Sequence, residues 1–387
     1  MIVKRLVARA ALVLLGVALP LVVLELVLRV VGPVVPGNYE TGVWAEGHPV
    51  YGHFHIPGAA AWVREPEFTT HLRFNRFGLR GPDFPEATET AEPRVLLLGD
   101  SFIEAKQVAE HQTVSDRLAA ALAERGGGRP HVLNAGTFDW GQVHEYLYLQ
   151  QAGPVLRPNV VVQFVYVGND IGDLWPRSRG ELRDLERPVA TVDDDGDLTF
   201  PEWHRRSATS GDALLGRLTR RSALARAYET GVVDKVRYAE RDGQGIEGQM
   251  LEVFRFKESP AEARAWKTLA ALLTATRDET ERQSARYALV IVPAKWQVYT
   301  EDWRALLAAI GEPDDERWVL RGPNRRITDL AGTLGVPVLD LLPVFRRAAG
   351  QGGERLYFPV DIHWTAAGHN LAAQAVGEFL MKRELVP

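Results

Sequence analysis

Apolar residues form one long run near the N-terminus. Residues 10–24 contain no charged side chain, and the run extends over residues 6–31 with Glu25 and Arg29 near its end. Glu25 and Arg29 stand four positions apart, a spacing at which two helical side chains can pair. Since about 20 apolar residues suffice for a helix to cross a bilayer, this run predicts a membrane anchor.

Basic residues set the predicted orientation of the anchor. Lys4, Arg5 and Arg9 lie at the start of the apolar run, and the positive-inside rule places such a flank in the cytoplasm. The body of the protein is then expected outside the cytoplasmic membrane, in the periplasm or at the cell surface. A cleaved signal peptide is the alternative and leads to the same location, although residues 16–18 (Gly-Val-Ala) are a poor cleavage site.

From residue 94 onward, short apolar runs alternate with segments of helical periodicity. The expected strands are residues 95–98, 131–133, 160–167, 288–292 and 336–339, and the expected helices are residues 113–124, 142–151, 261–283, 324–334 and 366–382. This alternation is typical of a parallel sheet with helices on both faces. Continuous apolar strands indicate burial of both faces, so the pattern predicts a three-layer α/β sandwich.

These patterns divide the chain into an anchor, a leader and a catalytic domain. Residues 1–32 are the anchor, and residues 33–93 are rich in Gly, Pro and aromatic residues without clear periodicity. Such a composition predicts an irregular leader that packs against the domain. In the domain, residues 94–387, the alternation is interrupted at about residues 173–260 by charged and Gly-rich sequence. A lid or substrate-binding insertion and a solvated excursion both fit this interruption.

The composition narrows the possible chemistry. The chain has no Cys, which excludes disulfides, cysteine nucleophiles and thiolate metal sites. The formal net charge is −5, and the first 32 residues contribute +3, which leaves −8 for the remainder. A net-negative body repels phosphate backbones, so nucleic acid is not an expected partner. His48, His53 and His55 cluster without an obvious carboxylate partner, and no metal site is expected there.

The main chemical signal follows the first expected strand. In residues 95–102 (VLLLGDSF), Ser101 stands directly after a buried strand and before a helix. Ligands bind at the carboxyl ends of strands in open parallel sheets, and a backbone N–H at a helix N-terminus favours negative charge. Ser101 is therefore the predicted nucleophile.

Further polar segments follow other strands. Residues 134–141 follow the second expected strand, residues 168–170 (Gly-Asn-Asp) follow the third, and residues 361–364 (Asp-Ile-His-Trp) lie just before the last helix. The carboxyl ends of parallel strands share one edge of a sheet. Residues that could serve as a nucleophile, an amide donor, an acid and a base are therefore expected together at this edge of the sheet.

In these four blocks, from about residue 94 to residue 380, the chain resembles the SGNH hydrolases, also called GDSL esterases. The resemblance implies a flavodoxin-like sandwich and a serine esterase that uses no cofactor. It also implies that Ser101 is the nucleophile and an oxyanion donor, that Asn169 is the oxyanion-hole amide and that His363 is the base. The leader resembles that of a bacterial membrane-anchored branch, which tends to show an Asn, Gly and Arg cluster like Asn75, Gly78 and Arg80.

Two positions depart from the common form of the family. The glycine that commonly donates its N–H to the oxyanion hole is replaced by Asp139, with Gly136 and Gly141 nearby. Asp139 and Gly136 are therefore the expected backbone donors at this place. Asp tolerates left-handed backbone and keeps its N–H, so the hole can survive, although the carboxylate could repel an oxyanion. Asp361 stands two residues before His363, where three residues are more usual. Because this shorter spacing occurs in related branches, Asp361 is still the expected acid, and Asp340 is a second candidate.

The mechanism implied is acyl transfer through a serine ester. With water as the second acceptor, the chain hydrolyses O-acyl esters, and an O-acetylated polysaccharide or peptidoglycan, or another small ester, is the expected substrate. With a sugar hydroxyl as acceptor it is an O-acyltransferase, which would need a membrane partner to deliver the acyl group. A non-catalytic glycan-binding or assembly protein is the third interpretation, and Asp139 is the feature that favours it.

Overall fold

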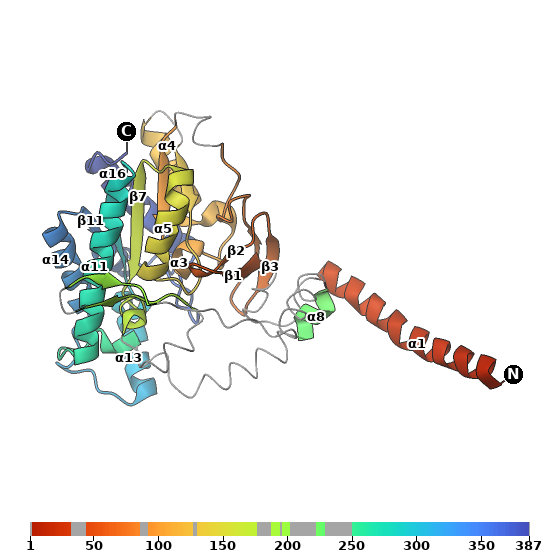
Figure 1. The fold of residues 1–387 in the computed structure, drawn as a ribbon. Helices are drawn as coiled ribbons and strands as arrows, with labels where there is room; N and C mark the ends of the chain where they lie inside the picture. The colour runs from red at the N-terminus through yellow and green to blue at the C-terminus, as the bar shows by residue number, and fades with distance from the viewer. Residues whose placement is uncertain are drawn as a thin grey trace.

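The computed structural model describes residues 2–31, 44–85, 92–126, 130–175, 187–193, 196–201, 222–228 and 250–386 (Figure 1). Its centre is a five-stranded sheet in the order β11-β10-β7-β5-β6, with all neighbours parallel. The strands are β5 (Arg94–Leu98), β6 (His131–Asn134), β7 (Val160–Tyr166), β10 (Arg286–Val292) and β11 (Val338–Asp340). Counted along the chain, this is the strand order 2-1-3-4-5 of flavodoxin-like folds, and the predicted fold is confirmed.

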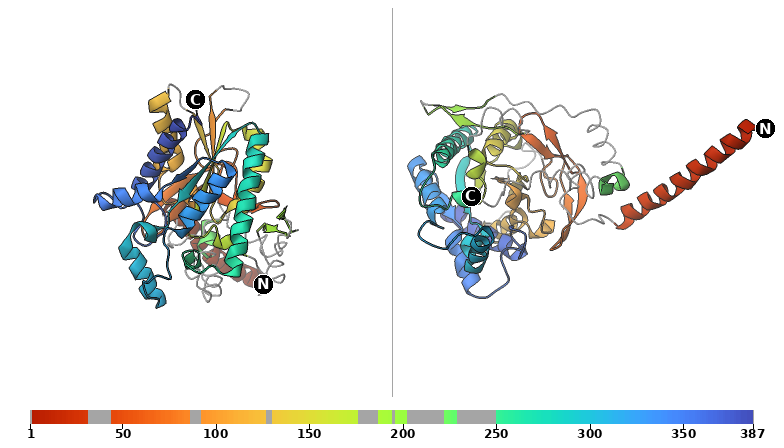
Figure 2. Two further views of the ribbon diagram at one scale, coloured as in Figure 1. Left: turned by 90° about the vertical axis from the view of Figure 1, so that its left-hand side faces the viewer. Right: turned by 90° about the horizontal axis from the view of Figure 1, so that it is seen from below.

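Helices cover both faces of this sheet. On one face, α4 (Val114–Gly126) packs against α16 (Ala366–Lys382), and on the other α5 (Gln142–Leu156) packs against α11 (Pro260–Arg282). The left view in Figure 2 shows the sheet between the two pairs. Further helices in the described part of the domain include α3 (Ser101–Glu104), η1 (Glu110–Gln112), η2 (Gly172–Leu174), α12 (Lys295–Val298), α13 (Thr300–Ile310), α14 (Gly322–Leu334) and α15 (Leu342–Gly350).

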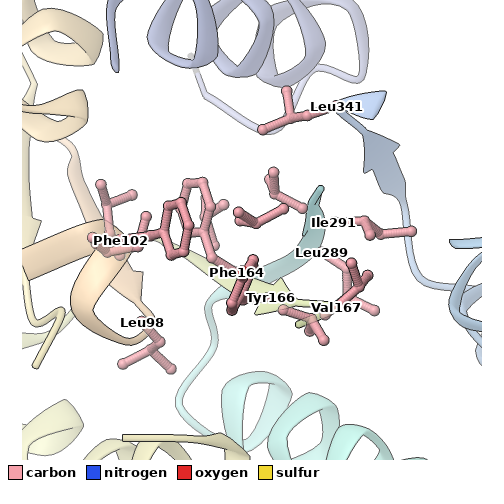
Figure 3. Packing of buried hydrophobic residues seen from close by; sticks show 14 of the residues in the cluster. Leu98, Phe102, Phe164, Tyr166, Val167, Leu289, Ile291 and Leu341 are labelled. Atoms are coloured by element: carbon pink, nitrogen blue, oxygen red, sulfur yellow. The ribbon is translucent and has the colours of Figure 1, made fainter. Parts of the chain in front are cut away.

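The central strands are buried along their whole length. Every residue of β5 and β7 is buried, as the continuous apolar runs predict. Phe102, in the helix that follows β5, points into the same core and packs on Tyr166 with ring centroids 4.4 Å apart (Figure 3). The turn that carries Ser101 is therefore anchored in the core by its next residue.

The leader is not irregular, contrary to the prediction. It forms two antiparallel hairpins, β1 (Ala45–His48) with β2 (Gly52–His55) and β3 (Ala60–Arg64) with β4 (Thr69–Arg73). In β3 and β4, exposed and buried residues alternate, and the buried face forms a small core with Trp44, Phe68 and Phe74. Each strand has only four or five residues, which is too short for a periodic pattern to stand out among the Gly and Pro residues.

The turn that follows β4 depends on two residues of the predicted Asn, Gly and Arg cluster. Asn75 Oδ1 accepts the backbone N–H groups of Phe77 and Leu79 at 2.9 and 3.1 Å. Gly78 has φ +74°, and a Cβ atom there would stand 2.9 Å from the carbonyl oxygen of His55. The cluster therefore fixes how closely the turn approaches β2.

The N-terminal helix α1 (Ile2–Val31) is, in the described part of the chain, the one helix long and apolar enough to cross a membrane. Residues Leu12–Val30 form the apolar stretch, and none of it is buried against the protein. Figure 1 shows the helix projecting away from the domain. These properties suit an anchor and also suit a signal sequence, and its orientation in a membrane stays a prediction.

Glu25, inside this helix, contacts Arg29 as predicted and also contacts the short helix α8. Arg29 donates to Glu25 at 2.7 Å. The Glu25 carboxylate also accepts the backbone N–H groups of Ala223 and Leu224 at 3.0 and 2.9 Å, at the start of the short helix α8 (Ala223–Tyr228). A piece of the predicted insertion therefore contacts α1.

Most of the predicted insertion lies outside the described residues. Its described pieces include β8 (Thr191–Val192), β9 (Leu198–Thr199) and α8. Trp203 also lies outside the described residues. The choice between a lid and a solvated excursion is therefore not decided.

Two glycines of the leader allow a matched test of this packing. Gly58 and Gly78 have nearly the same φ, +72° and +74°, but only Gly78 faces close neighbours. Gly58→Ala should lower the free energy of unfolding by about 1 kcal/mol through backbone strain. Gly78→Ala should cost about 1–3 kcal/mol more because its methyl group overpacks the turn. Urea denaturation of the full chain in detergent measures both, and equal losses would contradict the packing role of Gly78.

Candidate active site

The structure brings the predicted nucleophile, base and acid together. Ser101 Oγ lies 2.7 Å from His363 Nε2, and His363 Nδ1 lies 2.5 Å from Asp361 Oδ1. The same carboxylate oxygen accepts the backbone N–H of His363 at 2.8 Å. With Asp361 on Nδ1, the proton of a neutral imidazole stays on that nitrogen, and Nε2 is free to accept the serine proton.

Local backbone features hold Ser101 in place. Ser101 is the first residue of α3, and Asp100 caps this helix by accepting the N–H of Phe102 at 2.8 Å. The ring of Phe102 also lies 4.7 Å from the ring of His363, centroid to centroid. The residue after the nucleophile thus contacts both the core and the base.

Gly136 supports this turn by its small size. A Cβ atom at Gly136 would stand 2.3 Å from the backbone nitrogen of Glu104, inside α3. Its own N–H donates to Asn134 Oδ1 at 3.0 Å. Gly136 is therefore needed for close approach to α3, and its N–H, predicted as an oxyanion donor, already has an acceptor.

The other predicted oxyanion residues follow three adjacent strands. Ser101 follows β5, Asp139 follows β6 and Asn169 follows β7, and β5 lies between the other two. Asn169 Nδ2 lies 3.4 Å from Asp173 Oδ2, and Asn169 Oδ1 has no partner among the described residues. The parallel sheet therefore places Ser101, Asp139 and Asn169 at the same edge.

Asp139 adopts a left-handed backbone, which Asp tolerates better than most residues. Its φ is +57°. Its side chain is 67% exposed and lies 3.9 Å from Arg187, which also bonds Asp173 at 2.9 Å. Because the carboxylate faces solvent and a guanidinium, its repulsion of a nearby oxyanion is screened.

Asp361 is held as an ionised carboxylate. Burial opposes its ionisation, but the hydrogen bonds and charge of His363 outweigh burial and lower the pKa of Asp361 to about 2. Asp340, the second candidate for the acid, instead accepts Asn324 Nδ2 at 2.8 Å and the N–H of Leu342 at 2.9 Å. The Asp340 carboxylate therefore binds Asn324 and the first residue of α15, and His363 is not among its partners.

The loop that carries Asp361 is held by a leader residue that the sequence did not reveal. Glu67, in the turn between β3 and β4, accepts the N–H of Val360 at 2.9 Å and the N–H of Asp361 at 2.5 Å. Lys295 Nζ donates to the carbonyl oxygen of Pro359 at 2.6 Å. The backbone before His363 is therefore fixed from two sides.

The leader also contacts α3, the helix that begins with Ser101. His55 Nε2 lies 2.8 Å from Glu104 Oε1, with both side chains fully buried, and His55 Nδ1 lies 2.9 Å from the Gly78 carbonyl oxygen. Arg80 donates to the carbonyl oxygens of Glu104 and Val108 at 2.5 and 2.6 Å. The predicted cluster of leader residues thus acts on the end of α3.

Three buried carboxyl groups lie near the nucleophile. Burial raises the pKa of Asp100 to about 6 and that of Glu145 to about 8. Burial and the charges of Asp100 and Glu145 hold the pKa of Asp170 well above its usual range. Gln142 donates to Asp170 at 2.7 Å, and Gln163 donates to Glu145 at 2.6 Å. At Glu145 the folded protein therefore retains a proton at neutral pH that the unfolded chain releases.

His369, Trp140 and the three leader histidines have structural roles. Burial, with smaller contributions from Arg80 and His363, lowers the pKa of His369 to about 3, and its ring meets Trp364 edge to face. Trp140 is fully buried among leader aromatics. His48, His53 and His55 have separate partners, and the described residues contain no group of His, Asp and Glu suited to a metal.

Comparison with known proteins supports the predicted resemblance to the SGNH hydrolases. Residues 252–387 match the family described as SGNH hydrolase-like domain, acetyltransferase AlgX. This match covers about a third of the chain and includes His363 and Asp361. It confirms the predicted resemblance to SGNH hydrolases, while the membrane-anchored branch stays a prediction. No curated protein matches the chain in sequence.

Solved structures resemble the chain at low identity. The lipase/acylhydrolase from Enterococcus faecalis is 12% identical, with a TM-score of 0.39 over 75% of this chain and 96% of its own. The acetyl xylan esterase AlAXEase is 12% identical, with a TM-score of 0.39 over 76% of this chain and 100% of its own. LAE5, an alpha/beta hydrolase enzyme from the metagenome of Lake Arreo, is 12% identical, with a TM-score of 0.41 over 77% and 98%. At this identity the likeness concerns the fold alone.

Removal of the Glu67 carboxylate should loosen the acid loop. We expect Glu67→Ala to slow the reaction of Ser101 with a serine-directed fluorophosphonate about 10- to 100-fold, because small displacements of catalytic groups cost about this much. Glu67→Gln, whose amide oxygen can still accept, should retain more reactivity. The rate of covalent labelling is measured by mass spectrometry.

Arg73→Ala is the matched control for Glu67. It removes another contact between the leader and the domain, the 3.0 Å pair with Glu110, without touching the Asp361 loop. We expect its labelling rate to equal that of the wild type. Equal rates for Glu67→Ala and Arg73→Ala at equal melting temperatures would disprove the positioning role of Glu67.

The raised pKa of Glu145 predicts a pH dependence of stability. The folded state holds this proton up to about pH 8, while the unfolded chain releases it near its ordinary pKa of 4.5. The free energy of unfolding therefore falls as pH rises through this window. Glu145→Gln removes the titration, so its stability relative to the wild type should increase from pH 5 to pH 8 in urea denaturation. The exposed Glu354→Gln is the control, and identical slopes for all three proteins would refute the prediction.

Proposed function

We propose that this chain forms an acyl-enzyme at Ser101 and hydrolyses O-acetyl esters of a glycan outside the cytoplasmic membrane. The observation that carries the proposal is the continuous line of contacts from Ser101 Oγ through His363 to Asp361, at 2.7 and 2.5 Å. This is the arrangement by which a serine hydroxyl becomes a nucleophile. A non-catalytic binding protein would not need these three side chains within hydrogen-bonding distance of one another.

The first half of the reaction builds the acyl-enzyme. His363 Nε2 takes the proton of Ser101 as Oγ attacks the ester carbonyl carbon, and Asp361 stabilises the imidazolium that forms. The carbonyl electrons move to oxygen and return when the C–O bond to the alcohol breaks. The imidazolium gives its proton to the departing alcohol, which leaves an acetyl group on Ser101.

The tetrahedral intermediate needs donors for its oxygen. In the proposed mechanism these are the N–H of Ser101, at the start of α3, the side-chain amide of Asn169 and the N–H of Asp139. Removal of one such donor in comparable enzymes costs about 3–4 kcal/mol of transition-state stabilisation. Asn169 is the side chain among them, so it is the donor that a substitution can remove.

The second half of the reaction decides between two activities. Water, activated by His363, releases acetate and restores Ser101. A sugar hydroxyl in the same place would make the chain an O-acetyltransferase, and the description of the matching family as an acetyltransferase favours this second candidate. A transferase would take its acetyl group from a donor that a membrane partner supplies, and the N-terminal apolar helix would bring the two together.

The proposal is tested by covalent labelling and by ester hydrolysis. Wild-type protein should react at Ser101 with a fluorophosphonate and hydrolyse p-nitrophenyl acetate, and Ser101→Ala should lose at least about 1,000-fold of the hydrolysis rate. Ser284→Ala, at the opposite edge of the sheet before β10, should behave as wild type. Labelling at another residue, or hydrolysis by Ser101→Ala at the wild-type rate, would contradict the proposal.

Acceptor competition separates hydrolysis from transfer. The full chain is supplied with p-nitrophenyl acetate and an unacetylated oligosaccharide, and acetate and acetylated sugar are quantified. A hydrolase releases acetate in equal amount to p-nitrophenol whether or not the sugar is present. Acetylated sugar that appears as acetate falls would establish the transferase instead.

A further inference from the structure

The leader strand β2 brings His53 against the loop that carries Asp139. His53 Nε2 lies 2.8 Å from the carbonyl oxygen of Phe138, the residue before Asp139. Trp140, the residue after Asp139, donates its Nε1–H to the carbonyl oxygen of His53 at 3.2 Å. One leader residue therefore binds both neighbours of a proposed oxyanion donor.

The hydrogen bond between His53 and Phe138 has only one possible direction. A carbonyl oxygen accepts and cannot donate, so the proton is on His53 Nε2. Burial lowers the pKa of His53 from its ordinary value, which keeps the imidazole neutral at pH 7. His53 therefore acts on Phe138 through a hydrogen bond and not through a positive charge.

The carbonyl that His53 binds belongs to the same peptide unit as the N–H of Asp139. This unit is planar and trans, so its C=O and its N–H point in opposite directions. A hydrogen bond that fixes the carbonyl oxygen of Phe138 therefore also fixes the direction of the Asp139 N–H. Polarisation of the peptide unit by the same bond makes this N–H a stronger donor.

The N–H of Asp139 is available to an oxyanion. In the described part of the chain it has no acceptor, unlike the N–H of Gly136. Thr137, two residues before Asp139, donates its N–H to the carbonyl oxygen of Gly99 at 3.1 Å. Because Gly99 stands two residues before Ser101, the loop is bound to the turn that carries the nucleophile.

Ring packing restrains the same loop. The ring centroids of His53 and Phe138 lie 4.4 Å apart, and Phe138 meets Trp44 edge to face at 5.1 Å. Asp139 has φ +57°, a conformation that is unfavourable for a residue with a Cβ atom. Contacts from outside the loop are therefore needed to hold Asp139 in it.

We propose that His53 is a positioning residue for the oxyanion hole. It holds the Phe138–Asp139 peptide unit so that the Asp139 N–H faces the oxygen of the reacting ester carbonyl. The inference rests on the proposed function, because it places an ester at Ser101. On this assignment, a leader side chain fixes the donor at a position where the common form of the family has glycine.

Two amide side chains of different length test the hydrogen bond. In His53→Gln the side-chain amide nitrogen can take the place of Nε2 and still donate to Phe138, whereas in His53→Asn it is too short to reach. We expect His53→Asn to lower kcat/KM for p-nitrophenyl acetate about tenfold, because a misplaced donor stabilises the oxyanion poorly. His53→Gln should stay within about threefold of the wild type.

The measurements use the full chain in detergent, with active sites counted by fluorophosphonate labelling. The inhibition constant of phenylboronic acid, which forms a tetrahedral adduct with a serine, should rise about tenfold in His53→Asn. This constant does not depend on the fraction of active protein, so a loss of folded enzyme alone leaves it unchanged. The exposed His111→Asn is the matched control and should behave as the wild type.

A spectroscopic measurement observes the peptide unit itself. Phe138–Asp139 is the one Phe-Asp pair in the sequence. Protein labelled with carbonyl-¹³C Phe and ¹⁵N Asp therefore gives a single carbonyl–amide NMR signal. His53→Asn should shift its carbonyl resonance, and His53→Gln should shift it less. Phenylboronic acid should move the Asp139 amide proton in the wild type and leave it in place in Ser101→Ala.

The other outcomes overturn the inference. Equal losses in His53→Asn and His53→Gln, or an unchanged inhibition constant in His53→Asn, would show that the hydrogen bond does not support the oxyanion hole. Hydrolysis that depends on Ser101 but not on His53 would keep the enzyme and reject the positioning role. Hydrolysis that is equal in the wild type and Ser101→Ala would instead reject the proposed function, and the positioning role with it.

Discussion

The carboxyl edge of the parallel sheet is the constraint on which the site depends. Ser101 and His363 are 262 positions apart in the chain, yet their side chains lie 2.7 Å apart. They meet because β5 ends directly before Ser101, while the Asp361–His363 loop reaches the same edge before α16. The fully buried strands β5 and β7 fix that edge, since a slip of either strand would disrupt the close packing of side chains on both of its faces.

The leader converts this edge into a rigid site. It holds the nucleophile helix through Arg80 and the buried pair of His55 with Glu104, and it holds the acid loop through Glu67. A buried hydrogen-bonded pair is costly to break because the remaining polar group is then left without a partner. The segment between the apolar helix and the sheet is thus part of the active-site framework as well as a connection.

The sequence predicted what depends on local pattern, namely the parallel sheet, its flanking helices, and the placement of Ser101, Asp361 and His363 at one edge of the sheet. Strand ends and chain order are enough to place such residues on one rim. Glu67 could not be found this way, because a glutamate in a short hairpin turn resembles any surface acid and its partner Asp361 is 294 positions away. Helix α13 was missed although Trp303 and Leu307 stand at helical spacing, a signal that a periodicity count over residues 300–310 would have detected.

The triad alone does not decide between hydrolysis and transfer, because both activities share the acyl-enzyme and use His363 in the same way. What differs is which hydroxyl reaches the acyl carbonyl first, and this depends on the residues around the acceptor.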